Sequence, residues 1–146
     1  MPPPRYVLQT RSTGVTFTWD LYAHARRIET WRRTVSLVLV SWGASDATVE
    51  VARVGVSELL SNVVRHAGDP YCCLSVVRAG ERVTVRVGDR SSCVPKVAEP
   101  AWDAESGRGL WMLRAMSLDF GCDAEVGGKS VWFVLGLDPV DEGAVA

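Results

Sequence analysis

Three polar residues recur at intervals of four along one segment of the chain: Glu58, Asn62 and His66. On an α-helix, four residues advance the chain by about 400°, so these side chains form one slowly drifting stripe. A neighbouring apolar stripe would pack on a core: Ala52, Val56, Leu59, Leu60 and Val63. A carboxylate and an amide one turn apart supply oxygen ligands that a hard Mg²⁺ ion accepts, directly or through water. The spacing therefore indicates either a metal site or a solvated helix surface.

A second polar group, Asp89, ends a segment that alternates as a β-strand does. Val83, Val85 and Val87 share one face of that strand, and Asp89 continues the same face. A carboxylate on a buried face is costly unless a partner donates a hydrogen bond to it. We therefore expect Asp89 either to begin a turn or to form the floor of a pocket, where it would accept from an amino group.

Small residues gather at 106–110, where the sequence reads SGRGL before a short helical segment. Free backbone N–H groups at a helix N-terminus favour an anion, typically phosphate, because the helix dipole adds to them. A plain tight turn explains the same G-x-G pattern. Lys129, which follows Gly128 in a hairpin, is expected to be a surface residue rather than a ligand.

The elements that would position these groups follow from hydrophobic periodicity and turn residues. Short strands are predicted at 6–11 and 16–19, and a long amphipathic helix at 22–42. A second helix, with Asp46 as its N-cap, would end near His66, before a Gly-Asp-Pro stop signal. Hairpins are predicted from 72–78 with 82–89 and from 119–125 with 129–137.

Between the hairpins, residues 107–117 predict a short helix with Leu110 and Leu113 on one face, joined there by Met116 or Ser117. Residues 90–106 hold two prolines and lack periodicity, which predicts a lid or a disordered segment. Helices early in the chain and antiparallel hairpins late in it predict an α/β sandwich with helices on one sheet face.

Composition fits one domain, expected over 6–138, with flexible tails at 1–5 and 139–146. The 146 residues are 47% hydrophobic, enough for a core, and the net charge of −1 favours neither nucleic acid nor an anionic membrane. The four cysteines lack C-x-x-C spacing, so reduced thiols in a cytoplasm are expected rather than zinc or disulfides. No apolar segment follows the first five residues as in a signal peptide, and the run at 35–40 is too short to span a bilayer.

Together, these features describe a nucleotide site. They offer a carboxylate for an amino group, a polar stripe for a metal and a glycine turn for phosphates. From about 16 to 137 the chain resembles the GHKL (Bergerat-fold) ATPase family, and within it the bacterial anti-sigma-factor serine/threonine kinase branch. ELLSNVVRHA at 58–67 is similar to the N box, VRVGDRSS at 85–92 to the first glycine box, and ESGRGLWML at 105–113 to the second. GGKSVWFVL at 127–135 resembles the final strands of that branch.

The resemblance implies a Bergerat or histidine-kinase-like fold, with a mixed, largely antiparallel sheet under helices and a mobile lid loop. It implies ATP and Mg²⁺ as cofactors. Asn62 would hold Mg²⁺, Asp89 would accept from the adenine amino group, and Glu58 would orient or deprotonate the attacking nucleophile. Four positions of the second glycine box would complete the nucleotide site, and Arg65 or His66 would lie beside the phosphates. Those four are Gly107, Arg108, Gly109 and Leu110.

One departure from the family pattern bears on affinity. The first glycine box usually reads D-x-G-x-G, whereas 89–93 here reads DRSSC, with no glycine. Serine can turn the chain, but it disfavours positive φ and keeps the backbone farther from a base. This departure argues for weakened nucleotide binding.

Two functions follow from the resemblance. The first is an ATP-dependent protein serine/threonine kinase that phosphorylates an anti-anti-sigma (STAS) partner and regulates transcription by sequestering a sigma factor. The second is a non-catalytic regulatory binding module with a degenerate nucleotide site. A larger GHKL machine fits poorly because the chain has no transducer domain, and a sensor histidine kinase fits poorly because no Glu and Pro follow His24.

Protein partners are the ones expected, with no nucleic acid and no membrane. Most tryptophans are expected in the core, and Trp102 in the lid is the one that could anchor a partner. Trp132 adds apolar bulk to one sheet face, so a homodimer or a sigma-factor surface there remains open.

Overall fold

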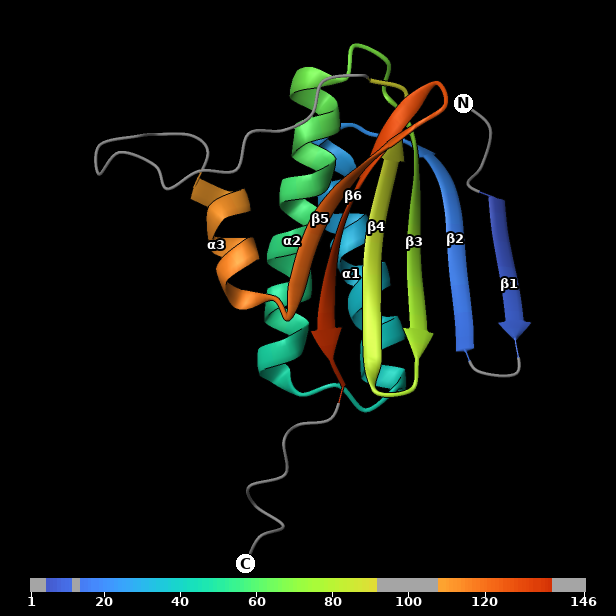
Figure 1. The fold of residues 1–146 in the computed structure, drawn as a ribbon, viewed down its shortest axis with the longest axis vertical. Coiled ribbons are helices and arrows are strands. Elements are labelled where there is room, and N and C mark those ends of the chain that lie inside the picture. The colour runs from blue at the N-terminus through green and yellow to red at the C-terminus, as the bar shows by residue number, and fades with distance from the viewer. Residues whose placement is uncertain (1–4, 12–13, 92–107, 138–146) are drawn as a thin grey trace, which may run out of the picture.

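The computed structural model describes residues 5–11, 14–91 and 108–137. Six strands form one sheet in the order β1-β2-β3-β4-β6-β5 (Figure 1). Every pairing between neighbours in this sheet is antiparallel. The strands are β1 (Arg5–Arg11), β2 (Gly14–Tyr22), β3 (Tyr71–Ala79), β4 (Arg82–Asp89), β5 (Asp119–Glu125) and β6 (Gly128–Gly136).

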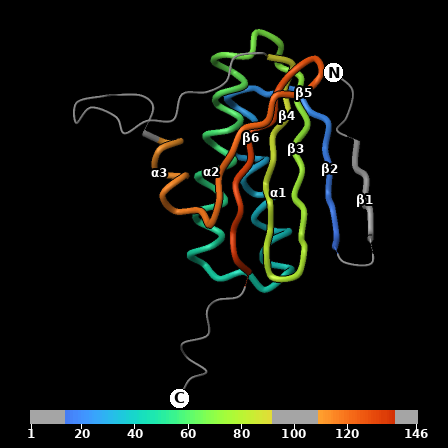
Figure 2. The backbone as a smooth tube through the Cα atoms, in the orientation of Figure 1, coloured from blue at the N-terminus to red at the C-terminus, as the bar shows by residue number. Residues whose placement is uncertain are grey.

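Helices α1 (Ile28–Ser41) and α2 (Asp46–His66) cover one face of the sheet (Figure 1). A 3₁₀ turn, η1 (Ala25–Arg27), precedes α1, and α3 (Arg108–Met116) lies beside α2, near β5 (Figure 2). The predicted α/β sandwich, with helices on one face of the sheet, is thereby confirmed. The parallel pairing that a mixed sheet would need is absent from the described strands, and the predicted lid at 90–106 lies almost wholly outside the described residues.

The core lies between the helices and the inner face of the sheet, and its centre is formed by β4 and β6. Val83, Val85 and Val87 face the helices, and each pairs directly with a buried apolar residue of β6. One of these partners, Phe133, packs against Gly55 of α2, where a Cβ atom would overlap the phenyl ring. Gly55 therefore allows α2 to approach the sheet closely. This contact sets the position of the helix that carries Glu58 and Asn62.

Two predicted helix starts differ from the structure. The first helix begins at Ile28 and not near Tyr22, because Tyr22 pairs with Tyr71 as the last residue of β2. Ser45, and not Asp46, is the N-cap of α2: its hydroxyl oxygen accepts from the Thr48 N–H at 3.1 Å. Asp46 instead occupies the first turn of α2, where its negative charge interacts favourably with the helix dipole.

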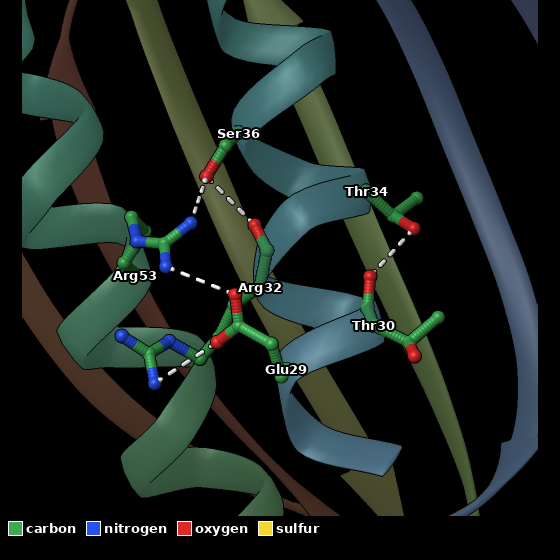
Figure 3. A network of polar contacts seen from close by, with 6 residues as sticks. All are labelled: Glu29, Thr30, Arg32, Thr34, Ser36 and Arg53. Carbon is green, nitrogen blue, oxygen red and sulfur yellow. Dashed lines mark hydrogen bonds and ion pairs between the residues drawn. The ribbon is translucent and has the colours of Figure 1, made fainter.

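Polar contacts join α1 to α2 on the outer side of the helical layer (Figure 3). Glu29 bridges Arg32 of its own helix at 3.2 Å and Arg53 of α2 at 3.1 Å. Ser36 donates to the Arg32 carbonyl at 2.7 Å and accepts from Arg53 at 3.5 Å. Because Glu29 is half exposed, these pairs contribute little to stability and serve mainly to align the two helices.

The described tryptophans lie partly in the core and partly on the surface. Trp31 is buried and packs against Trp19, with ring centroids 6.1 Å apart. Trp42 packs against the core, and Trp111 is 38% exposed on α3. Trp132 lies on the sheet face without helices, where its Nε1 donates to Asp123 at 3.1 Å. Trp102 lies outside the described residues.

Candidate functional site

The predicted stripe lies on α2 with its apolar neighbour against the core. Ala52, Val56, Leu59, Leu60 and Val63 are all buried, whereas Glu58 and Asn62 are half-buried. Within the described residues, no hydrogen bond or ion pair engages the Glu58 carboxylate. The Asn62 Nδ2 atom is buried and has no hydrogen-bond partner. A buried amide nitrogen without a partner is costly, so this position fits a bound polar group.

The start of α3 lies directly against Glu58. A Cβ atom on Gly109 would overlap the Glu58 carboxyl group, so a larger residue here would displace that carboxyl group. The structure therefore brings together the N box and the second glycine box, which are far apart in the sequence. Leu110, the next residue, is buried in the hydrophobic core with Leu113. Gly107 lies outside the described residues, and Arg108 is the first residue of α3.

Gly109→Ala is expected to cost little stability, about 1 kcal/mol or less, because the Glu58 carboxyl group that it would displace is the end of a flexible, half-buried side chain. Alanine is the better helix former, so helix propensity alone predicts the opposite sign. Urea unfolding of the Gly109→Ala, Glu58→Ala and double variants measures the coupling between the two positions. We expect the cost to disappear in the Glu58→Ala background, and an equal cost in both backgrounds would contradict the contact.

The other two predicted phosphate-side residues, Arg65 and His66, are exposed in the last turn of α2. Arg65 Nε donates to the Ser61 carbonyl at 3.4 Å, a weak contact that leaves its guanidinium available to a ligand. From His66 a short connection leads to β3, and Cys72 of β3 pairs with Asp89. Both side chains therefore lie at the same end of the molecule as Asp89.

Asp89 is buried and engaged through both carboxylate oxygens. Its Oδ1 accepts from the Ser91 N–H at 2.7 Å, and its Oδ2 accepts from Lys129 Nζ at 2.8 Å. The prediction that Lys129 is a surface residue is wrong, since Lys129 is only 4% exposed. The register of β4 with β6 places it opposite Asp89 on the helix-facing side. The spacing in the sequence indicated the burial of Lys129, because Lys129 shares one strand face with Val131, Phe133 and Leu135.

The chain after Asp89 turns without the glycines of the family pattern. Arg90 lies over the Tyr71 ring, 4.2 Å from its centroid, and pairs with Asp69 at 3.1 Å. No described residue other than glycine has a positive φ, so Arg90 and Ser91 do not need that freedom. The close approach comes from Gly128 instead, where a Cβ atom would overlap the Asp89 carbonyl oxygen. Positions 92 and 93 lie outside the described residues.

The described cysteines are free thiols, as predicted. Burial, with smaller contributions from Cys73 and Asp89, raises the pKa of Cys72 from 9.0 to about 12. Burial and the Asp20 carboxylate raise the pKa of Cys73 to about 11. The described residues contain no cluster of three His, Cys, Asp or Glu side chains able to hold a metal ion. Among the described residues, Glu58 and Asn62 are the predicted oxygen donors near the start of α3.

These thiols make the folded state sensitive to alkali. Cys72 is protonated in both states below pH 9, and above it the thiol ionises in the unfolded chain but not in the folded protein. The free energy of unfolding should therefore fall as pH rises from about 9 to about 12. Urea unfolding at several pH values, with Cys72→Val beside the parent, tests this. A Cys72→Val protein with the same alkaline loss would contradict the assignment.

Comparison with known proteins adds the family. A profile described as the histidine kinase-like ATPase domain matches residues 21–135. The chain belongs to this family. No curated protein sequence matches it. None of the described helices is long and apolar enough to cross a membrane.

A solved structure agrees with the family fold. The crystal structure of the RsbU and RsbW domains of Rv1364c from Mycobacterium tuberculosis superposes with a TM-score of 0.61. The alignment covers 93% of this chain and 32% of that one, at 20% sequence identity. This histidine kinase-like ATPase domain thus spans about a third of the length of that protein, and at this identity the likeness concerns the fold. A domain of this ATPase family is a nucleotide-binding domain, and the gathered polar residues agree with that function.

Proposed function

We propose that this protein binds ATP with Mg²⁺ and transfers the γ-phosphoryl group to a serine or threonine hydroxyl of a STAS-type partner. In this proposal it also sequesters a sigma factor, and phosphorylation of the STAS partner releases that partner. The observation that carries the catalytic part is the Glu58 carboxylate, which has no partner among the described residues and lies against the start of α3. The resemblance of the three motifs to the anti-sigma-factor kinase branch supports the choice of partners.

The residues present fit a Mg²⁺–nucleotide complex. Asn62 and Glu58 offer oxygen atoms, the ligands that Mg²⁺ prefers. The buried Nδ2 atom of Asn62, which has no partner, is a donor and would suit a phosphate oxygen. Mg²⁺ held there would supply positive charge that neutralises part of the phosphate charge. Asn62 would hold the ion. The Gly107–Gly109 turn and the exposed Arg65 and His66 would lie beside the phosphates.

Glu58 would act on the acceptor hydroxyl. Its carboxylate accepts the hydroxyl proton while the hydroxyl oxygen forms a bond to the γ-phosphorus. The bond from that phosphorus to the bridging oxygen breaks, and ADP leaves with the electron pair. Gly109 keeps Glu58 in place, because any larger residue would displace its carboxyl group.

The remaining expectations complete the proposal. We keep as predictions a single domain over 6–138 that acts in the cytoplasm with protein partners. The net charge of −1 favours neither nucleic acid nor an anionic membrane as a partner. A homodimer remains a prediction that solution mass would test.

A second candidate, a regulatory module with a degenerate nucleotide site, is favoured by one specific observation. Asp89, the residue expected to accept from adenine, already pairs with Lys129 and Ser91. Under this alternative the protein would bind its partners without transferring phosphate.

Asn62→Ala decides whether the metal assignment is right. We expect Mg²⁺ to strengthen ATP binding to the parent protein and not to the variant. The variant lacks the amide oxygen that would bind the metal, but it keeps Asp89, which would bind adenine. Calorimetric titration with ATP, in Mg²⁺ and in EDTA, measures this difference. Ser57→Ala, on the same helix, is the matched control and should keep the full Mg²⁺ dependence. Equal ATP affinity of the parent with Mg²⁺ and with EDTA would overturn the assignment.

A further inference from the structure

We propose that Lys129 contacts the adenine base of ATP and contributes to the preference of the site for adenine. In this inference, which rests on the proposed nucleotide site, Asp89 accepts from the 6-amino group of adenine and Lys129 donates to the adjacent ring nitrogen, N1. The acidic residue alone would read one position of the base, and the pair reads two. Lys129 thereby becomes a binding residue of the site.

The pair lies where the apolar inner face of the sheet ends. Asp89 and Lys129 are directly opposite each other in the β4–β6 ladder, on the face that the helices cover. Their side chains are 3% and 5% exposed, and Nζ lies 2.8 Å from Oδ2. Gly128 allows β6 to begin close against the Asp89 carbonyl, which holds Lys129 beside the carboxylate. The positions of both charged groups are therefore set by the backbone register.

Among the described residues, both members of the pair have hydrogen-bonding capacity to spare. A lysine ammonium carries three N–H donors, and within the described residues only Asp89 accepts from Lys129. Each carboxylate oxygen of Asp89 can accept two hydrogen bonds, and among the described residues Oδ1 accepts from the Ser91 N–H and Oδ2 accepts from Lys129. Buried donors without partners are costly, so the ammonium fits a ligand that carries an acceptor. A donor and an acceptor thus lie side by side at one point.

Adenine presents the complementary pattern. Its 6-amino group is a donor, and the neighbouring N1 is an acceptor. With the amino group at Asp89, N1 would face the ammonium of Lys129. A 6-oxopurine reverses both positions, because its carbonyl would face the carboxylate and its N1–H would face the ammonium. The pair therefore selects adenine more strongly than Asp89 alone would.

Calorimetry with an altered base tests the contact in the full chain. In 1-deaza-ATP a C–H group replaces N1, and in 7-deaza-ATP the change lies away from the pair. We expect the parent to bind 1-deaza-ATP about ten-fold or more weaker than ATP, the size of one hydrogen bond to a charged group. Its affinity for 7-deaza-ATP should stay close to that for ATP.

Two variants of Lys129 complete the test. Lys129→Met should bind ATP and 1-deaza-ATP equally, and Lys129→Gln, which keeps a donor, should retain part of the difference. The parent comparison and Lys129→Gln decide the question even if Lys129→Met does not fold.

Different failures are distinguishable. Equal affinity of the parent for ATP and 1-deaza-ATP would overturn the role of Lys129 and leave the nucleotide site intact. Tighter ATP binding by Lys129→Met would show that Lys129 obstructs the base, which also overturns the inference. Absence of ATP binding by the parent would overturn the proposed function, and the inference with it.

Discussion

Glu58→Gln is expected to keep ATP binding and to slow phosphoryl transfer by about 10²–10⁴-fold, the usual effect of losing a general base. The substitution is nearly isosteric, so the contact with Gly109 should survive while the proton acceptor disappears. A loss of this size far exceeds what a small change in stability produces in a protein that still binds ATP.

The assay must include the protein substrate, because an enzyme that positions a protein hydroxyl can hydrolyse ATP slowly in water. Transfer of label from γ-labelled ATP to candidate STAS proteins is the measurement. Glu50→Gln is the matched control, since Glu50 is an exposed glutamate earlier on α2. A Glu58→Gln protein that labels its partner at the parent rate would remove Glu58 from the mechanism. If the parent labelled no STAS protein while a sigma factor co-purified with it, the sequestering module would be the better proposal.

The parts of this fold that the sequence predicted are those that depend on local patterns. β4 was predicted with the bounds that the structure has, because Val83, Val85 and Val87 alternate with polar residues over the whole strand. The end of α2 at His66 follows from the glycine and proline after it. The choice between Ser45 and Asp46 as the N-cap was not decidable locally, because both residue types cap helices well.

The parts that the sequence missed depend on contacts between distant segments. Lys129 and Asp89 are 40 residues apart, and only the register of β4 with β6 brings them together. The contact of Gly109 with Glu58 likewise depends on how α3 packs on α2. Periodicity places a residue on a face of its own element, but it does not give the residue that faces it. The stripe of Glu58 and Asn62 was therefore predictable, whereas the contact of Glu58 with Gly109 on another helix was not.

Removal of one member of the Asp89–Lys129 pair is expected to destabilise the protein by about 3–5 kcal/mol, because the remaining charge stays buried without a counterion. Lys129→Met leaves a carboxylate among apolar side chains, and Asp89→Asn leaves an ammonium there. The pair itself contributes little net stability, since taking both charges out of water offsets most of their attraction.

The double variant separates these two statements. Asp89→Asn with Lys129→Met removes both charges and keeps an oxygen that can accept from the Ser91 N–H. We expect this protein to recover most of the stability that either single variant loses, as measured by urea unfolding at neutral pH. Arg86→Met with Asp123→Asn is the matched control, because Arg86 and Asp123 pair at 3.1 Å on the more exposed face of the sheet. There the single variants should cost about 1 kcal/mol or less. If the losses at Asp89 and Lys129 were simply additive, the two side chains would not be coupled. The ion pair would then have no part in holding the end of β6 against β4.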